Sequence, residues 1–297
     1  MLEISIVLPV YNEAGIVSRV IEEIHSVMKT TSFDYEVIAV DDKSSDNSLE
    51  ILQRCKDTTV IARERRGGSG AARKTGVLHA KGNIIVMLDA DGTYDPHDIP
   101  RLLSFFPKFD QVNGARMQER GTAKLLRVPA KWFLRKLASY IVQVNIPDLN
   151  TGFKAFKRDI MKNFIWLIPN GFSCVSTMTL AFLINDLKVK WVPVEYRRRT
   201  GRSKFHPIKD TYNYLLTVIR ICAYFDPLKI LIPLGSFFFL LGLTKSLLDI
   251  FWGYFQKTTY INIMLLLTGI FIWTIGILAD IIVRYGKAGL RLTNNEQ

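Results

Sequence analysis

The sequence is poor in cysteine and histidine, and neither residue type shows the spacing of a metal site or a disulfide framework. Its three cysteines, Cys55, Cys174 and Cys222, are scattered and form no C-x-x-C pair. This excludes a zinc-finger site and a disulfide-stapled scaffold. The four histidines show no ligand spacing either. We therefore expect a reducing environment for the folded part of the chain.

The first apolar run has no basic segment before it. The chain opens MLEISIVLPVYNE, and the run from Ile4 to Val10 is short and rich in β-branched residues. A signal peptide would need a positively charged start and a longer apolar stretch, so we expect none. The run is instead typical of a buried β-strand.

Negative charge is also scarce relative to positive charge. The chain holds 39 lysines and arginines against 27 acidic residues, for a formal net charge of +12. Such a balance favours acidic partners: anionic lipid, nucleic acid or phosphorylated substrates. Because the basic residues gather beside apolar segments and no nucleic-acid reader motif is present, we expect membrane lipid rather than nucleic acid as a partner.

Two long apolar runs lie near the C-terminus. Residues 230–248 contain one charge, Lys245, and residues 258–279 contain none. Crossing the hydrocarbon core of a bilayer takes roughly 20 helical residues, so both runs qualify as spans. The alternative is a pair of buried core helices. Arginine and lysine flank the two runs on their outer sides, whereas the link 249–257 is nearly neutral. The positive-inside rule then predicts a multi-pass membrane protein whose catalytic domain and both termini are cytoplasmic.

The first 116 residues alternate between strand and helix patterns, which predicts an α/β fold with a mostly parallel sheet. We expect strands over Ile4–Val10, Tyr35–Val40, Thr59–Ala62 and Asn83–Leu88, and helices over 12–28 with Asn12 as the cap, 46–54 and 70–80. Ligands bind beyond the carboxyl ends of the strands in such sheets. The polar residues that follow these strands are therefore the candidate site: Tyr11, Asn12, Glu13, Asp41, Asp42, Asp89 and Asp91.

A glycine-rich stretch, residues 68–75, nearly fits a nucleotide-binding P-loop. Arg73 occupies the position of the second required glycine, and the preceding strand pattern is weak. We therefore interpret the glycines as the opening of a helix whose N-terminus faces a phosphate.

Asp89 and Asp91 lie two residues apart at the end of an apolar strand. Such a pair suits a hard divalent cation, Mg²⁺ or Mn²⁺, that also takes diphosphate oxygens. The metal would neutralise charge on a leaving nucleoside diphosphate. The alternative for these two residues is a solvated turn.

Three segments in order, residues 7–13, 40–46 and 88–94, resemble family 2 glycosyltransferases of the GT-A fold. The resemblance implies a Rossmann-like catalytic domain that binds a nucleotide sugar. It implies a nucleotide site made of Pro9, Tyr11, Glu13, Asp42, Asp89 and Ala90, and a metal held by Asp89 and Asp91.

Later segments narrow the resemblance. Residues 148–154 and 198–204, with Arg116, resemble the polyprenyl-phosphate sugar transferases, including the dolichyl-phosphate mannose synthase type and the two-span polyprenyl-phosphate glucosyltransferases. Thr93 departs from the glutamine that is frequent in the mannose synthases. The resemblance, together with the basic stripe described next, gives a catalytic set of Asp89, Asp91, Arg116 and Arg198 and an acceptor-phosphate set of Arg116, Arg135, Arg198 and Lys204.

The stretch 116–135 carries a basic residue every three or four positions. If it is helical, these residues form one stripe, as in a helix that lies in the membrane interface. The alternative is a solvated basic face.

The resemblance implies an acidic residue after Gly171, where many relatives carry one, and this chain has none there. A lipid monophosphate is mostly ionised at neutral pH, so its oxygen needs no general base to remove a proton.

These observations predict four parts: a GT-A domain (1–210), a juxtamembrane amphipathic helix (211–228), a two-helix transmembrane region (229–286) and a cytoplasmic tail (287–297). The expected activity is inverting transfer of a hexose from a UDP-glucose-type or GDP-mannose donor to polyprenyl or dolichyl phosphate. The alternatives are a processive polysaccharide synthase, whose Q-x-x-R-W segment is missing, and an inactive membrane scaffold of the same fold.

Overall fold

The computed structural model describes residues 3–116, 136, 138–140, 142–171, 173–197, 216, 226–251 and 259–294. The chain divides into two compact units, Met1–Val218 and Ile219–Gln297. The expected interfacial helix within 116–135 lies almost entirely outside the described residues, as does most of the juxtamembrane helix 211–228.

The first unit is built on one seven-stranded sheet with the order β3-β2-β1-β4-β6-β5-β7. Its strands are β1 (Ile4–Val10), β2 (Tyr35–Asp41), β3 (Thr58–Ala62), β4 (Ile84–Met87), β5 (Gln111–Arg116), β6 (Lys154–Lys157) and β7 (Val189–Val194). Strand β6 runs antiparallel to both of its neighbours, and the other strand pairs are parallel. The predicted mostly parallel α/β sheet is confirmed.

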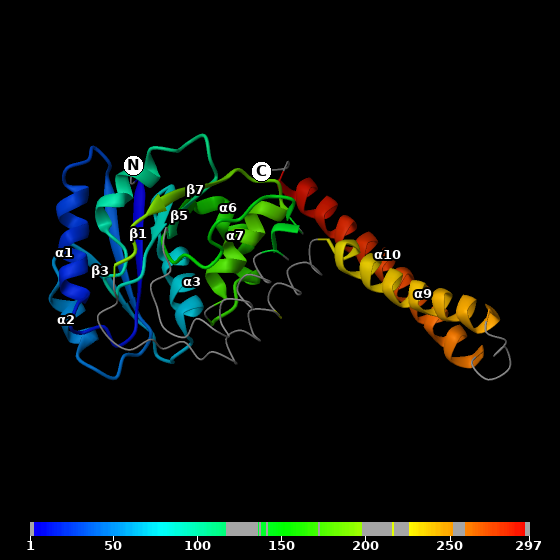
Figure 1. Cartoon of the computed structure of the whole chain (residues 1–297). Helices are drawn as coiled ribbons and strands as arrows, with labels where there is room; N and C mark the ends of the chain where they lie inside the picture. The colour runs from blue at the N-terminus through cyan, green and yellow to red at the C-terminus, as the bar shows by residue number, and fades with distance from the viewer. Residues whose placement is uncertain are drawn as a thin grey trace. The chain divides into compact units, whose positions relative to one another are not determined.

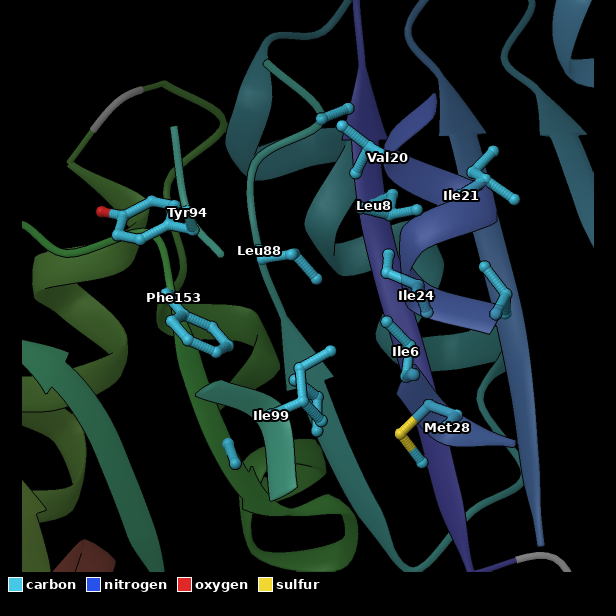
Figure 2. Packing of buried hydrophobic residues seen from close by; sticks show 14 of the residues in the cluster. Ile6, Leu8, Val20, Ile21, Ile24, Met28, Leu88, Tyr94, Ile99 and Phe153 are labelled. Carbon is cyan, nitrogen blue, oxygen red and sulfur yellow. The ribbon is translucent and has the colours of Figure 1, made fainter. Parts of the chain in front are cut away.

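Helices cover both faces of this sheet (Figure 1). They are α1 (Val17–Met28), α2 (Ser48–Arg54), α3 (Ser69–His79), α4 (Ile99–Leu103), α6 (Arg158–Phe164) and α7 (Cys174–Ile184), with short 3₁₀ turns η1 (Pro96–Asp98) and η2 (Ile165–Leu167). Successive side chains of β1 point to opposite faces of the sheet, as in any strand, so alternate residues pack in the two hydrophobic cores on either face. Ile6 and Leu8 pack with α1 (Figure 2), whereas Val7 packs with α3 and α7.

One helix begins later than the sequence predicts. The expected cap Asn12 lies outside α1, which starts at Val17 without a side-chain cap. Asn12 instead has a positive φ of 53°, and its side-chain oxygen accepts a hydrogen bond from the Ser45 amide at 2.8 Å. Asparagine tolerates this backbone conformation better than most residues, so Asn12 ties the loop after β1 to the loop after β2.

The second unit is a hairpin of α9 (Leu228–Phe251) and α10 (Thr259–Asn294). Both helices are long and apolar enough to cross a membrane, and large apolar side chains on them are exposed. Glycines line their contact: a Cβ atom on Gly269 would lie 2.7 Å from the carbonyl oxygen of Gly235. Small residues allow this close backbone approach between apolar helices, which is how helices pack in lipid.

Candidate functional site

The loops after β1, β2 and β4 meet at one edge of the sheet. Val10 is in register with Asp41, and Val7 with Met87, so the residues that follow these strands are neighbours. Of the residues predicted to bind the nucleotide, Pro9, Tyr11, Glu13 and Asp89 are partly exposed at this edge, whereas Asp42 and Ala90 are buried.

Asp42 organises the loop after β3. Its carboxylate accepts hydrogen bonds from the amides of Gly67 at 2.9 Å and Gly68 at 2.6 Å, and it pairs with the guanidinium of Arg63. Gly68 has a φ of 91°, a conformation that glycine adopts without steric cost. Asp42 therefore fixes the backbone that leads into α3, and its contact with a nucleotide stays a prediction.

The prediction that the N-terminus of α3 faces a phosphate is wrong for its first amides. Gly70 N and Ala71 N donate to the carbonyl oxygen of Asn170, at 2.8 Å and 3.3 Å. A Cβ atom on Gly70 would lie 1.9 Å from the carbonyl oxygen of Pro169. The glycine-rich stretch thus permits close packing against the 169–170 turn, because that turn supplies the helix cap that a phosphate would otherwise supply.

Arg73 is a site residue that sequence analysis missed. It is 1% exposed on the inner face of α3, and its guanidinium pairs with the carboxylate of Asp89. Burial acts to lower the pKa of Arg73, but the charge and hydrogen bond of Asp89, together with the neighbouring Cys174 and Tyr94, raise it above its ordinary value. The only signal in the sequence was the helical spacing that aligns Arg73 with buried Val77.

Asp91 is held by the turn that follows it. Its Oδ1 accepts hydrogen bonds from the Thr93 amide at 3.2 Å and the Thr93 hydroxyl at 2.6 Å. Gly92 between them has a φ of 70°. Thr93 is fully buried, so its hydroxyl orients the Asp91 carboxylate.

Gly152 brings a distant segment against the first of these aspartates. A Cβ atom at this position would lie 2.3 Å from Oδ2 of Asp89, so only glycine fits there without displacing the carboxylate. The Gly152 amide donates to the Tyr94 hydroxyl at 2.9 Å. Burial raises the pKa of Tyr94, which keeps its hydroxyl protonated beside Asp89.

Arg116, the last residue of β5, forms a two-point ion pair with Asp148 at the same edge of the sheet. Arg116 Nε lies 2.7 Å from Asp148 Oδ2, and Nη2 lies 2.9 Å from Oδ1. Burial alone would raise the pKa of Asp148, but the hydrogen bonds and charge of Arg116 hold it below its ordinary value. The guanidinium also lies over the ring of Tyr196, 5.4 Å from its centroid. The Arg116 guanidinium is therefore held by Asp148 and by the ring of Tyr196.

The segment after β7 returns to the turn that carries Asp91. The Arg197 amide donates to the Thr93 carbonyl at 2.8 Å, and the Arg197 side chain pairs with Asp95. Tyr196 bridges to Tyr94. The predicted acceptor residues Arg198 and Lys204 follow directly in sequence, and they lie outside the described residues, as does Arg135.

The described residues contain no cluster of three or more histidine, cysteine or acidic side chains that would hold a metal by themselves. Asp89 and Asp91 supply hard carboxylate oxygens, and Gly152 leaves the space beside Asp89 clear of a side chain. A magnesium-type cation is commonly bound by one or two carboxylates with substrate phosphates and water completing the shell. The two aspartates fit that pattern.

Both units contain a segment that matches a known protein family. Residues 5–165 match the model of glycosyl transferase family 2, and residues 226–285 match that of the GtrB C-terminal hairpin. An undecaprenyl-phosphate 4-deoxy-4-formamido-L-arabinose transferase from Pseudomonas fluorescens is 28% identical over 247 residues, 78% of this chain and 68% of the relative. A dolichyl-phosphate beta-glucosyltransferase from Trichomonas vaginalis is 27% identical over 242 residues, 74% of this chain and 70% of the relative.

Solved structures share the fold of the first unit. Glucosyl-3-phosphoglycerate synthase from Mycobacterium tuberculosis, in complex with Mn²⁺, UDP-glucose and phosphoglyceric acid, has a TM-score of 0.58 at 18% identity, covering 74% of this chain and 79% of that one. Mannosyl-3-phosphoglycerate synthase from Rubrobacter xylanophilus has a TM-score of 0.57 at 18% identity, covering 74% of each chain. At this identity the likeness concerns the fold alone.

Proposed function

The chain belongs to glycosyl transferase family 2, and on that premise we propose that it transfers a hexose from a nucleotide diphosphosugar to a polyprenyl phosphate at a membrane. One observation carries the proposal. The Arg197 amide is bonded to the Thr93 carbonyl at 2.8 Å, so the segment that continues into Arg198 and Lys204 starts at the turn that holds Asp91. This contact supports a site in which the residues for the donor and those for the acceptor lie close together.

On the donor side, Asp89 and Asp91 face the diphosphate, with Pro9, Tyr11, Glu13, Asp42 and Ala90 around the nucleoside. A divalent cation, Mg²⁺ or Mn²⁺, bound between these carboxylates and the diphosphate would neutralise charge that develops on the leaving group. Arg73 holds Asp89 in one orientation, and Thr93 does the same for Asp91. Ligand groups fixed in this way need no reorganisation during the reaction.

On the acceptor side, the nucleophile is a phosphate oxygen of the lipid. That oxygen is already ionised at neutral pH, so no protein base has to remove a proton. It bonds to the anomeric carbon while the bond from that carbon to the diphosphate breaks, with inversion. Arg116, Arg135, Arg198 and Lys204 bring the two anions together by offsetting their repulsion. Arg116 is pre-oriented for this role by Asp148.

The hairpin of α9 and α10 supports a membrane location, because the acceptor is a lipid and both helices are long enough to span a bilayer. We assign the GT-A domain to residues 1–210 and the spans to 229–286. The domain and both termini lie on the cytoplasmic side. The basic flanks of the hairpin favour this orientation.

The test uses the full chain purified in detergent, with polyprenyl phosphate and a panel of UDP-glucose, UDP-N-acetylglucosamine and GDP-mannose. Sugar should appear on the lipid with one of these donors, and EDTA should stop it until Mn²⁺ or Mg²⁺ is returned. Polyprenol without the phosphate is the matched control acceptor and should stay unmodified. An Arg116→Ala variant should lose transfer. Glycosylation of polyprenol, growth of a polysaccharide or no transfer from any donor would contradict the proposal.

A further inference from the structure

The loop of residues 63–68, here called the arginine loop, connects β3 to α3. Asp42 anchors both of its ends through Arg63 and through the amides of Gly67 and Gly68. The Arg63 amide also donates to the Asp41 carbonyl at 2.9 Å. A Cβ atom on Gly67 would lie 2.5 Å from Arg63 Nη1, so a side chain at position 67 would have to displace the Arg63 guanidinium.

Between these anchors, Arg66 lies over the ring of Tyr11. Its guanidinium carbon is 4.1 Å from the ring centroid, the geometry of a cation–π contact. Stacked layers need about 3.5–4 Å each, so a base between the two groups would require about twice the observed spacing. A base can therefore stack on this face of Tyr11 only if Arg66 moves away.

The side chain is free to make such a move. Arg66 is exposed, and its anchors are backbone and side-chain contacts of its neighbours rather than of Arg66 itself. Arg63 cannot play this part because it is paired with Asp42.

We propose that Arg66 occupies the stacking position of the donor's base on Tyr11 and thereby makes the site select nucleoside diphosphates over uncharged nucleosides. The inference rests on the proposed function, because it takes Tyr11 as a residue of the nucleotide site. Every base must break the Arg66–Tyr11 contact. A diphosphate recovers more free energy than the broken contact costs, because the released guanidinium is attracted to its negative charge, whereas a nucleoside recovers none.

The test compares affinities of the full chain in detergent for uridine and UDP, and for guanosine and GDP, by calorimetry. In Arg66→Ala, nucleoside affinity should rise about two- to fivefold, the size of an exposed cation–π contact. Diphosphate affinity should fall at least about twofold, because a cation is lost. The ratio of diphosphate to nucleoside affinity should shrink by about four- to tenfold or more. Arg65→Ala is the matched control: Arg65 is an exposed neighbour of the same charge, and its replacement should leave nucleoside affinity unchanged.

A second measurement needs no comparison of variants. The side-chain Nε proton of Arg66 should show an upfield ring-current shift in the free protein, and UDP should remove it. The inference is overturned if Arg66→Ala weakens uridine binding, if it matches Arg65→Ala, or if the ring-current shift survives saturation with UDP. If the unmodified chain binds neither UDP nor GDP, the proposed function itself fails, and that result is distinct from the others.

Discussion

The two halves of the catalytic sheet place their polar residues differently. In the parallel half, β3-β2-β1-β4, strands β1 and β4 are apolar apart from Ser5, and the carboxylates of Glu13, Asp89 and Asp91 come after these two strands end. In the mixed half, β6-β5-β7, fully buried polar side chains lie inside the strands, among them Gln111, Asn113 and Lys154. Strands β1 and β4 therefore keep the apolar core and the site residues in separate segments, whereas the strands of the mixed half carry buried polar side chains within them.

The mixed half holds its buried polar groups by hydrogen bonds to α7. Lys154 Nζ donates to the Val175 carbonyl at 2.6 Å and to the Thr179 hydroxyl at 2.9 Å, and Gln111 reaches the same hydroxyl at 3.0 Å. Among the buried side chains described in this sheet, Gln111 Oε1 and Asn113 Nδ2 have no hydrogen-bond partner. Buried polar groups stabilise a fold only when they are satisfied. We therefore expect the mixed half to be the more sensitive of the two to pH and to polar substitutions in its core.

The largest effect is expected where the parallel half ends. Asp91→Ala should lower the rate of sugar transfer by about 10³-fold or more, since one fixed charge-stabilising group accounts for effects of that order. Its Mn²⁺ affinity in the presence of UDP, measured by electron paramagnetic resonance, should fall as well. Asp159→Ala, at a carboxylate that is 80% exposed, is the control and should change neither. Full activity in Asp91→Ala would refute the metal assignment.

Next comes the ion pair that lies beneath the site. Asp89→Ala leaves the buried Arg73 without its counter-charge. Because Asp89 itself is 36% exposed, water can reach this end of the guanidinium, and we expect a loss of about 1–3 kcal/mol of unfolding free energy, the cost of an unsatisfied buried group. The midpoint of thermal unfolding should drop. The double variant Asp89→Ala with Arg73→Met should recover most of that stability without recovering transfer. Equal midpoints for the single and double variants would show that the pair is not coupled.

Gly152 tests the contact between the two halves. Gly152→Ala would place a methyl group 2.3 Å from Asp89 Oδ2, so the carboxylate must move. Overpacking of this kind costs about 1–3 kcal/mol, and we expect transfer to fall by at least about tenfold. Gly15→Ala is the control, because a Cβ atom there meets nothing within 4 Å. Unchanged transfer in Gly152→Ala would mean that the position of Asp89 does not matter.

The smallest effect concerns the mixed half. Burial lowers the pKa of Lys154 to about 7, below its value in the unfolded chain. Between pH 7 and about pH 10 the unfolded state therefore binds more protons, and stability should rise with pH in that window. The unfolding free energy of Lys154→Met lacks this rise with pH. The difference between the unmodified chain and Lys154→Met should therefore grow by about 1 kcal/mol per pH unit in this window, in favour of the unmodified chain.

Thermal unfolding midpoints from pH 7.5 to 9 measure this difference. Lys162→Met, at an exposed lysine, should show no such dependence. A parallel pH response of Lys154→Met and the unmodified chain would contradict the lowered pKa.

The sequence alone was sufficient for features that depend on local pattern. Continuous apolar runs of strand length predicted β1, β2 and β4, and the runs of 230–248 and 258–279 predicted the two hairpin helices. The three motif segments, residues 7–13, 40–46 and 88–94, were sufficient to identify the family. Burial on both faces of a parallel sheet forces continuous apolar strands, and a bilayer forces continuous apolar helices, so these elements can be read from the chain directly.

The tertiary structure decided the contacts that orient the site. Arg73 and Asp89 are 16 residues apart, and Arg116 and Asp148 are 32 apart. Gly152 and Asp89 meet across an even longer separation. No periodicity links such positions, because their proximity follows from strand order and from the antiparallel insertion of β6 next to β4. A sequence shows which residues can perform the chemistry, but the pairing of strands determines which of them are held against one another.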